Sequence, residues 1–415
     1  MDEKGTAAPS RRQPKHRLIR ILLVVTLSIM LCLGAYVGYA AVRASRPVSL
    51  PAPTGPYAVG RTITEWADPG RADPLAPQAG TPRRLAIWLW YPAAPPPNAA
   101  PAQYAPGLWA GLQLGGVLAW SETSFDKIQV HAAADVPVAA GRFPVVVLLP
   151  GLGFAAAQYT TIAEDLASRG YLVVGVTPTY SANLTVIGGV TIPADEAGNP
   201  AVFEGGDLHA GAAQAAGDRL VDVWAGDARF AASRAADLQT EGRFAGHVDT
   251  TATIYIGHSF GGAAALEACR SDARCAGAAD VDGTQYGTVV HTGLAKPMML
   301  IGSESSCVTG ACEPADAGER ADQATARSLI DAGKAPVWCY RITGSEHFNF
   351  TDYGAYYLAA PADFLIALGS VDGRDALTIT STYLDAFLDH VVGGRSEPLL
   401  TAPSLRSGKS LLCRR

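Results

Sequence analysis

The sequence is poor in features that would suggest a metal, a cofactor or a nucleic acid as a partner. Its 415 residues include 8 histidines and 7 cysteines, at no spacing typical of a zinc site. Only 17 % of the residues are charged, and the net charge is −6. Residues 1–20 carry +4, so the rest carries −10 and offers no basic patch for a nucleic acid. We therefore expect no metal, no cofactor and no nucleic-acid partner.

One segment, residues 21–42, has no charged residue at all. It is long enough to cross a bilayer as a helix, and five basic residues precede it: Arg11, Arg12, Lys15, Arg17 and Arg20. This asymmetry predicts a basic cytoplasmic tail over residues 1–20 and a transmembrane anchor over 21–42, so that the N-terminal partner is a membrane. A cleaved signal peptide is the alternative, with residues 38–40 as a weak cleavage site. The rest of the chain is then either held outside the cytoplasm by a single pass of the cell membrane or secreted.

The cysteines suit an oxidising compartment. Cys32 lies in the apolar segment, which leaves an even six elsewhere: Cys269, Cys275, Cys307, Cys312, Cys339 and Cys413. Cys307 with Cys312, or Cys269 with Cys275, could close a short loop, but the sequence does not fix the pairing.

Composition divides the chain further. Residues 43–56 are rich in proline and read as a stiff spacer. Residues 57–400 contain enough apolar material for one large α/β domain, and residues 401–415 form a C-terminal tail. Within the domain, residues 107–140 are ambiguous, since they either form a helical cap near the active site or cover the sheet.

Buried-type strands alternate with helices from residue 143 onward. Strands are expected over residues 145–149, 171–177, 253–256, 275–281, 297–301 and 337–342, with an early strand over 83–91. Helices are expected over residues 155–168, 210–238, 320–332 and 378–392. This alternation predicts an α/β fold, with a mostly parallel sheet covered by helices on both faces.

The most informative motif lies between one of these strands and a helix. Residues 257–262 read Gly-His-Ser-Phe-Gly-Gly, after the apolar run 253–256 and before the alanine-rich run 263–268. A strand, a serine flanked by glycines and a helix, in this order, are typical of a nucleophile elbow. The glycines relieve close backbone contacts in so sharp a turn. The pattern predicts a serine hydrolase with Ser259 as the nucleophile.

A nucleophilic serine needs a base and a group that orients the base. Asp282 follows the strand that ends at residue 281, and His347 follows the last strand. The order Ser, Asp, His is that of α/β-hydrolases, so we expect His347 to be the base and Asp282 to orient it. Asp280 is the alternative acid, because it would lie on the same face of the strand. Of the remaining histidines, His258 is expected to be a packing or hydrogen-bonding neighbour.

An oxyanion hole requires two backbone N–H donors. The residue after the nucleophile, Phe260, is expected to supply one. Leu152, in the turn after the strand 145–149, is expected to supply the other.

These residues together resemble the platelet-activating-factor acetylhydrolase-like branch of the α/β-hydrolases. The matching segments are residues 150–153 (PGLG), 163–171 (AEDLASRGY), 257–262 (GHSFGG), 282–283 (DG) and 344–350 (GSEHFNF). The resemblance implies an α/β-hydrolase fold and a lipase-like esterase without a metal, acting on short or modified acyl esters, including acetyl groups of phospholipids. It also implies that Ser259, Asp282 and His347 are the triad, and that Leu152 and Phe260 are the oxyanion donors.

The chain departs from that family at two places. Pro150 stands where the family commonly has a histidine, and residues 177–180 lack the charged residues often found there. The identity of the substrate is therefore not carried over.

The sequence thus predicts an exported, membrane-tethered ester hydrolase that forms an acyl-enzyme, with a lipid or small-molecule ester as its substrate. Two alternatives remain open. An acyltransferase would use the same triad and pass the acyl group to an alcohol other than water. A catalytically silent hydrolase fold would serve as a binding module.

Overall fold

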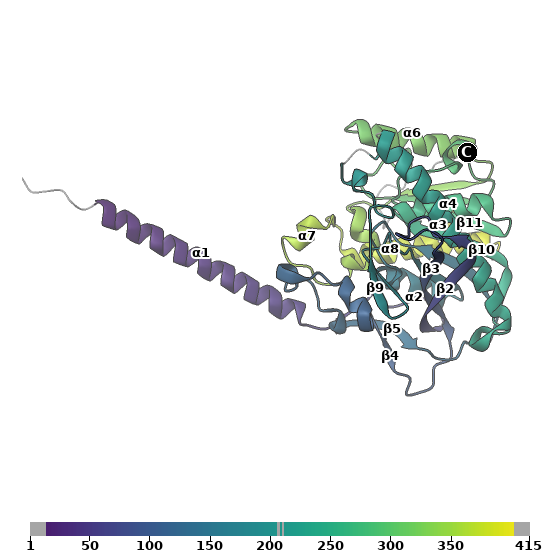
Figure 1. The fold of residues 1–415 in the computed structure, drawn as a ribbon, viewed down its shortest axis with the longest axis horizontal. Helices are drawn as coiled ribbons and strands as arrows, with labels where there is room; N and C mark the ends of the chain where they lie inside the picture. Colours follow the sequence, from purple (N-terminus) through teal and green to yellow (C-terminus); the bar gives the residue numbers. More distant parts are fainter. Residues whose placement is uncertain (1–13, 206–207, 210, 402–415) are drawn as a thin grey trace, which may run out of the picture.

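A twisted, mostly parallel sheet forms the centre of the molecule in the computed structural model, which describes residues 14–205, 208–209 and 211–401 (Figure 1). Eleven of the described strands share this sheet in the order β1-β5-β2-β3-β7-β6-β10-β11-β12-β13, with β4 paired to β5. Their bounds are β1 Val48–Ser49, β2 Ala58–Ala72, β3 Pro82–Ala93, β4 Pro101–Gln103, β5 Ile128–Ala134, β6 Phe143–Leu149, β7 Leu172–Thr177, β10 Val248–His258, β11 Cys275–Val281, β12 Met298–Gly302 and β13 Val337–Arg341.

The strands from β7 to β13 in this order pair in parallel, as the alternation of strands and helices predicts. β3 pairs antiparallel with both β2 and β7. The long strand β2 was not predicted, because its polar, proline-containing sequence has no continuous apolar run. β8 Leu184–Ile187 and β9 Val190–Pro193 form a separate hairpin.

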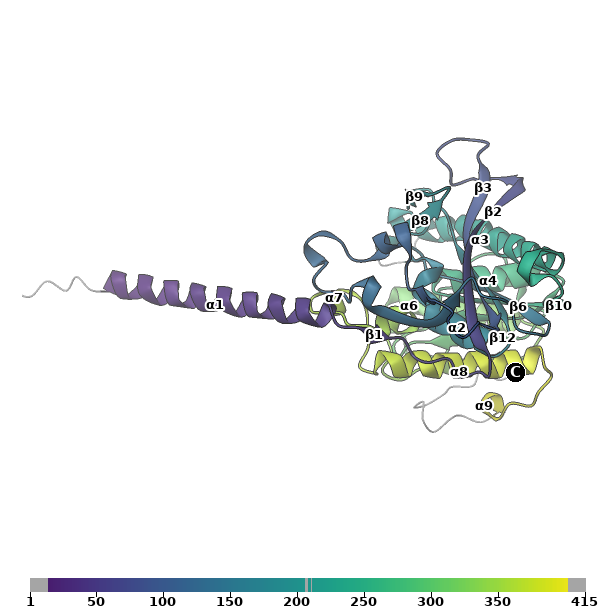
Figure 2. The same cartoon turned by 90° about the horizontal axis from the view of Figure 1, so that it is seen from below.

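Helices cover both faces of the sheet. The described helices are α1 Pro14–Ala44, α2 Thr160–Ser168, α3 Gly211–Asp237, α4 Phe260–Ser271, α5 Val289–Thr292, α6 Ala317–Ala332, α7 Ala362–Leu365, α8 Gly373–Val391 and α9 Pro398–Thr401. α2 and α8 bury their apolar residues in one core, and α3, α4 and α6 bury theirs in a second core. Figure 2 shows α8 and α3 on opposite sides of the strands. Alternate residues of each strand, such as Val146 and Val147, enter opposite cores.

α1 projects from the domain as a single long helix (Figure 1). Residues Arg17–Ala44 are long and apolar enough to cross a membrane, and the most apolar stretch is not buried against the protein. The C-terminal part of the helix does contact the domain: the Tyr36 hydroxyl donates to the Ala360 carbonyl, and its ring meets that of Trp120 edge-on. The Arg43 guanidinium lies over the Tyr357 ring.

Residues 43–56, which were expected to form a stiff spacer, instead pack along the domain. Val48 and Ser49 pair with β5, and Leu50 is buried. The Thr54 N–H and hydroxyl donate to Asp165 Oδ1 at 2.7 and 2.8 Å. The Gly55 N–H donates to Ser168 Oγ at 2.8 Å. The expectation was wrong because proline favours extended backbone, and extended backbone can bind along a domain as well as stand free of it.

Residues 107–140, which the sequence left open, cover the edge of the sheet. They form short 3-10 turns, η1 Gly107–Leu112, η2 Gly116–Leu118 and η3 Phe125–Lys127, followed by β5. Trp109 packs edge-on against Trp88 of the core, and Glu122 forms a β-bridge with Leu358. The segment contains no long helix of the kind a helical cap would need.

Two disulfides pair cysteines that are close in the sequence. Cys269–Cys275 joins the end of α4 to β11, and Cys307–Cys312 closes the loop after β12. Cys339 is also disulfide-bonded, and Cys413 lies outside the described residues. Cys32, in α1, is free and exposed.

A buried ion group fixes β3 to α3. Arg83 is fully buried and contacts Asp73 at 3.0 Å and Asp227 at 2.6 Å. Burial alone would lower the pKa of Arg83, but the two carboxylates outweigh it and raise this pKa. Nothing in the local sequence pattern indicated this group, because Asp227 lies far from Arg83 and Asp73 in the chain.

Candidate active site

Ser259 lies in a strained turn between β10 and α4. Its backbone has φ +54° and ψ −128°, a region that residues with a Cβ rarely occupy. The turn requires the glycines on either side. A Cβ at Gly257 would lie 2.0 Å from the Gly261 carbonyl oxygen, and a Cβ at Gly261 would lie 2.3 Å from the Pro150 carbonyl oxygen. The turn therefore has the backbone geometry of a nucleophile elbow.

The structure brings Ser259, His347 and Asp282 together from three separate elements. Ser259 Oγ is 3.0 Å from His347 Nε2, and His347 Nδ1 is 2.8 Å from Asp282 Oδ2. His347 begins the turn η8 His347–Phe350 after β13, and Asp282 directly follows β11. The carboxyl ends of neighbouring parallel strands lie at one edge of a sheet, which is why residues so distant in sequence meet there.

Asp282, and not Asp280, contacts the histidine. Asp282 Oδ1 also accepts from the Ser303 N–H at 2.7 Å. Burial alone would raise the pKa of Asp282, but its hydrogen bond and charge interaction with His347, together with the Ser303 N–H, hold this pKa below its usual value. Asp282, and not Asp280, is thus the carboxylate placed to accept a proton from His347 Nδ1.

Asp280 lies behind the site in a different role. It accepts from the Gly283 N–H and from Gln285 Nε2, both at 3.0 Å. Burial, together with the nearby charge of Asp282, raises its pKa well above the usual value. Asp280 therefore supports the turn after β11 rather than the histidine.

The two expected oxyanion donors, Leu152 and Phe260, have free N–H groups. Gly151 N–H donates to the Tyr159 hydroxyl at 2.8 Å, and Gly153 N–H donates to the Ser181 carbonyl at 3.2 Å. Among the described residues, the Leu152 N–H between them has no acceptor. Phe260 is the first residue of α4, where an N–H has no partner within the helix. No acceptor is thus found for either N–H within the part of the chain that the structure describes.

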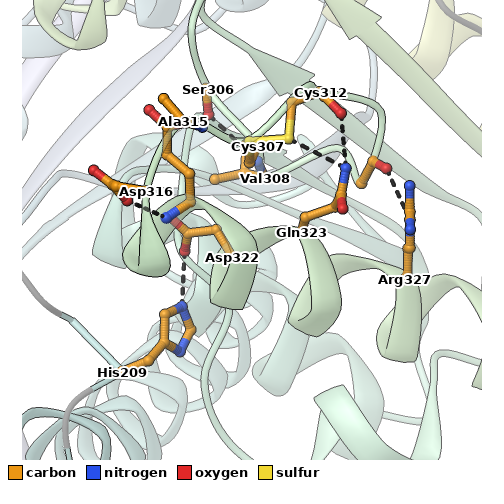
Figure 3. Close-up of a disulfide and its surroundings, with 12 residues drawn as sticks. His209, Ser306, Cys307, Val308, Cys312, Ala315, Asp316, Asp322, Gln323 and Arg327 are labelled. Atoms are coloured by element: carbon orange, nitrogen blue, oxygen red, sulfur yellow. Dashed lines mark hydrogen bonds and ion pairs between the residues drawn. A yellow bond between two sulfur atoms is a disulfide. The ribbon is translucent and has the colours of Figure 1, made fainter.

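The loop after β12 supports the acid. It supplies the Ser303 N–H, and the Cys307–Cys312 disulfide closes it farther along (Figure 3). Gln323 of α6 donates to the Cys312 carbonyl at 2.8 Å, and Asp322 of the same helix contacts His209 Nε2 at 2.9 Å. Both ring nitrogens of His209 thus contact residues other than Ser259. Sequence reasoning missed Ser303, because a backbone donor leaves no trace in residue type.

Three comparisons with known proteins bear on this site. A family model described as platelet-activating factor acetylhydrolase, isoform II, matches residues 233–397. This stretch is therefore similar to the platelet-activating factor acetylhydrolase family. This stretch contains Ser259, Asp282 and His347, whereas Leu152 lies outside it.

Relatives whose alignments extend beyond this stretch are also esterases or acetylhydrolases by name. A probable 1-alkyl-2-acetylglycerophosphocholine esterase from Arthroderma benhamiae is 24 % identical over 404 residues, which cover 88 % of this chain and 94 % of the relative. The platelet-activating factor acetylhydrolase of Cavia porcellus is 23 % identical over 283 residues, covering 65 % and 62 % of the two chains. The solved ferulic acid esterase of Streptomyces cinnamoneus is 27 % identical, with a TM-score of 0.72 and coverage of 88 % and 99 %. The chain has the α/β-hydrolase fold and is a carboxylic-ester hydrolase.

Two groups of aromatic side chains lie near the candidate site. Phe154 stacks on Phe348 with ring centroids 5.3 Å apart, and Phe348 is 5.0 Å from the His347 ring. On the other side, Phe203 lies 6.1 Å from the Phe260 ring and 6.4 Å from that of Tyr286. The surroundings of Ser259 are therefore apolar as well as hydrogen-bonded, which suits an ester better than a charged substrate.

Proposed function

We propose that this chain is an exported, membrane-tethered esterase that uses Ser259, His347 and Asp282 as its catalytic triad. The observation that carries the proposal is the continuous pair of contacts, 3.0 Å from Ser259 Oγ to His347 Nε2 and 2.8 Å from His347 Nδ1 to Asp282 Oδ2. A serine hydroxyl is a weak nucleophile until a base removes its proton, and this arrangement supplies the base in the required tautomer.

In the acylation step, Ser259 Oγ attacks the ester carbonyl carbon while its proton passes to His347 Nε2. The carbonyl oxygen becomes negatively charged, and the N–H groups of Leu152 and Phe260 donate to it. The positive end of α4 adds to this stabilisation. When the intermediate collapses, His347 returns the proton to the leaving alcohol, and the acyl group stays on Ser259.

In the deacylation step, a water molecule takes the place of the alcohol. His347 Nε2 removes a proton from the water, whose oxygen attacks the acyl carbon. Collapse of the second intermediate breaks the bond to Ser259 Oγ, which regains its proton from His347. The products are a carboxylic acid and the free enzyme, and Asp282 keeps its negative charge throughout.

We propose lipid esters or esters of short acyl groups as the substrates. The names of the two curated relatives refer to an acetyl ester of a glycerophosphocholine or to platelet-activating factor, and the solved relative is named for ferulic acid. The two curated names share an acetyl group, whereas the solved relative is named for an aromatic acid. The apolar rings of Phe154 and Phe348 beside His347 support an apolar ester.

The tether is proposed from α1. Its exposed side chains are apolar along most of its length, and basic residues precede it in the sequence. Cell fractionation followed by carbonate extraction, with N-terminal sequencing of the exported protein, tests this. A protein that stays in the membrane with α1 intact supports an anchor, whereas a soluble protein that begins after about residue 40 supports a cleaved signal sequence.

The catalytic proposal is tested with the full chain purified in detergent. We expect hydrolysis of a series of p-nitrophenyl esters from acetyl to palmitoyl, with the highest kcat/KM at the short end, and no hydrolysis by Ser259→Ala. Ser271→Ala, at the exposed other end of α4, is the matched control and should retain full activity. Activity in Ser259→Ala would refute the proposal.

Two other outcomes would point to the alternative functions. An added alcohol that receives most of the acyl group, with little free acid formed, would indicate an acyltransferase. A folded wild-type chain that hydrolyses no ester in the series, and is not labelled at Ser259 by a fluorophosphonate, would indicate a binding module.

A further inference from the structure

A chain of buried hydrogen bonds runs behind Ser259 and connects the two halves of the site. The Gly151 N–H contacts the Tyr159 hydroxyl oxygen at 2.8 Å, and this oxygen lies 2.8 Å from His258 Nδ1. His258 Nε2 lies 2.9 Å from the carbonyl oxygen of His347. The side chains of Tyr159 and His258 are buried. This series of hydrogen bonds therefore runs from the loop of one expected oxyanion donor to the backbone of the catalytic base.

Every bond in this chain has only one possible direction. The Gly151 N–H can only donate, and the His347 carbonyl can only accept. His258 must therefore carry its proton on Nε2, which leaves Nδ1 as an acceptor for the Tyr159 hydroxyl proton. Burial, with a smaller contribution from His347, lowers the pKa of His258 to about 3, so the ring stays neutral at physiological pH. With both ring nitrogens engaged, His258 has no free site to accept a proton from Ser259.

The two ends of the chain are the parts of the site whose positions matter most. Leu152 directly follows Gly151, so fixing the Gly151 N–H fixes the peptide from which the Leu152 N–H points. The His347 carbonyl belongs to the residue whose ring bonds Ser259 and Asp282. The rings of His258 and His347 are 4.6 Å apart, and a Cβ at Gly151 would lie 3.2 Å from His258 Nδ1. Little room is therefore left for independent movement.

We propose that Tyr159 and His258 are positioning residues that hold the loop containing Leu152 and the catalytic histidine at fixed positions relative to each other. The proposal rests on the proposed function, because it assumes that Leu152 and His347 act on the ester. It assigns no proton transfer to either residue. Their task is to keep the donor at Leu152 and the base at His347 at a fixed separation as charge develops between them.

Tyr159→Phe is the most direct test, because it removes one oxygen atom and leaves the ring in place. The Gly151 N–H and His258 Nδ1 both lose their partner. We expect kcat for p-nitrophenyl acetate to fall by about 10-fold to 100-fold, with KM changed by less than about threefold, since a displacement of about 1 Å costs this much in rate. The affinity for an arylboronic acid, which forms a tetrahedral adduct with the serine, should fall in parallel with kcat.

Tyr255→Phe is the matched control. Tyr255 is a buried tyrosine on β10, and its hydroxyl donates to Asp272 Oδ2 at 2.6 Å, at the distal end of α4. Both variants lose one buried hydroxyl and should lose similar thermal stability. Only Tyr159→Phe should lose kcat. His258→Gln is the second variant, and it should resemble Tyr159→Phe because an amide does not reproduce both bonds of the ring.

Three results would overturn the inference. One is a Tyr159→Phe variant that keeps kcat within twofold of wild type while losing stability as Tyr255→Phe does, which would leave only a structural role. Another is equal loss of kcat in both tyrosine variants. The third is a Tyr159→Phe variant whose pH profile of kcat is shifted rather than only lowered, which would indicate a proton relay. Activity surviving in Ser259→Ala would instead refute the proposed function, so the two failures are distinguishable.

Discussion

Asp282→Asn, compared with Asp280→Asn, tests the geometry of the site most sharply. In the wild type, Asp282 Oδ2 accepts the proton on His347 Nδ1, and Oδ1 accepts the Ser303 N–H. An asparagine can keep the bond to Ser303 through its carbonyl oxygen. Its amide group then faces His347 Nδ1 and donates to it. The proton of the histidine moves to Nε2, where it faces Ser259 and blocks the base.

The expected loss follows from two effects. The ring adopts the wrong tautomer, and the imidazolium that forms during the reaction loses its counter-charge in a buried place. Such a change costs about 10⁴-fold in kcat, or about 5 kcal/mol of transition-state stabilisation. Asp280→Asn should keep kcat within about threefold, because the Asp280 carboxyl contacts Gly283 and Gln285 rather than the histidine.

The assay is steady-state hydrolysis of p-nitrophenyl acetate by both variants, beside circular dichroism and thermal unfolding to show that each is folded. The reasoning is refuted if Asp280→Asn loses as much kcat as Asp282→Asn does. It is also refuted if folded Asp282→Asn retains more than about a tenth of wild-type kcat.

Three further predictions concern stability. Arg83→Leu leaves the buried Asp73 without its ion-pair partner and leaves Asp227 with Arg71 alone, and urea unfolding should report a loss of about 3–5 kcal/mol, whereas a loss under 1 kcal/mol would contradict the buried ion group. Replacing Cys307 and Cys312 together by serine should cost about 2 kcal/mol through the entropy of the opened loop, seen as a lower Tm without reductant; an unchanged Tm would contradict this. Burial and the nearby carboxylate of Asp165 outweigh the Arg169 guanidinium, which lies 2.6 Å from Asp385, and raise the pKa of Asp385 to about 9. The folded protein then holds a proton that the unfolded chain releases above about pH 4, and stability should fall as the pH rises between these values. The free energy of unfolding should therefore fall with pH less steeply in Asp385→Asn than in wild type, by up to about 1.4 kcal/mol per pH unit between pH 5 and 8 in urea titrations. Parallel pH profiles of the two proteins would count against this.

The sequence predicted the parallel part of the fold well, because each element carries its own local signal. The apolar run of β11 and the turn at Asp282 could be read directly, and the predicted strand bounds agree with the structure within about two residues except at β10, which begins five residues earlier than predicted. β2 and the docked segment at residues 48–55 could not be predicted. Their stability comes from partners such as β5 and Asp165, which are distant in the chain, and such contacts leave no pattern in the local sequence.

The site was predictable only as far as its chemistry depends on residue type. Ser259 and His347 are marked by flanking glycines and by chain order. Tyr159 is not marked, since a tyrosine near the start of a helix is most often a core residue, and only the fold places its hydroxyl between Gly151 and His258. The sequence likewise could not decide whether Asp282 or Asp280 contacts the histidine, because the direction of a side chain at the end of a strand depends on the turn that follows.

The docked segment between α1 and the domain determines how the two can move. A flexible linker of about ten residues would have an end-to-end distance of roughly 15–20 Å and would let the domain rotate in any direction. Here the pairing of β1 with β5 and the bonds of Thr54 and Gly55 to α2 remove that freedom. The connection between the helix and the domain is thus fixed rather than flexible. A change in the tilt of the helix would turn Ser259 by the same angle and so change the side from which an ester approaches.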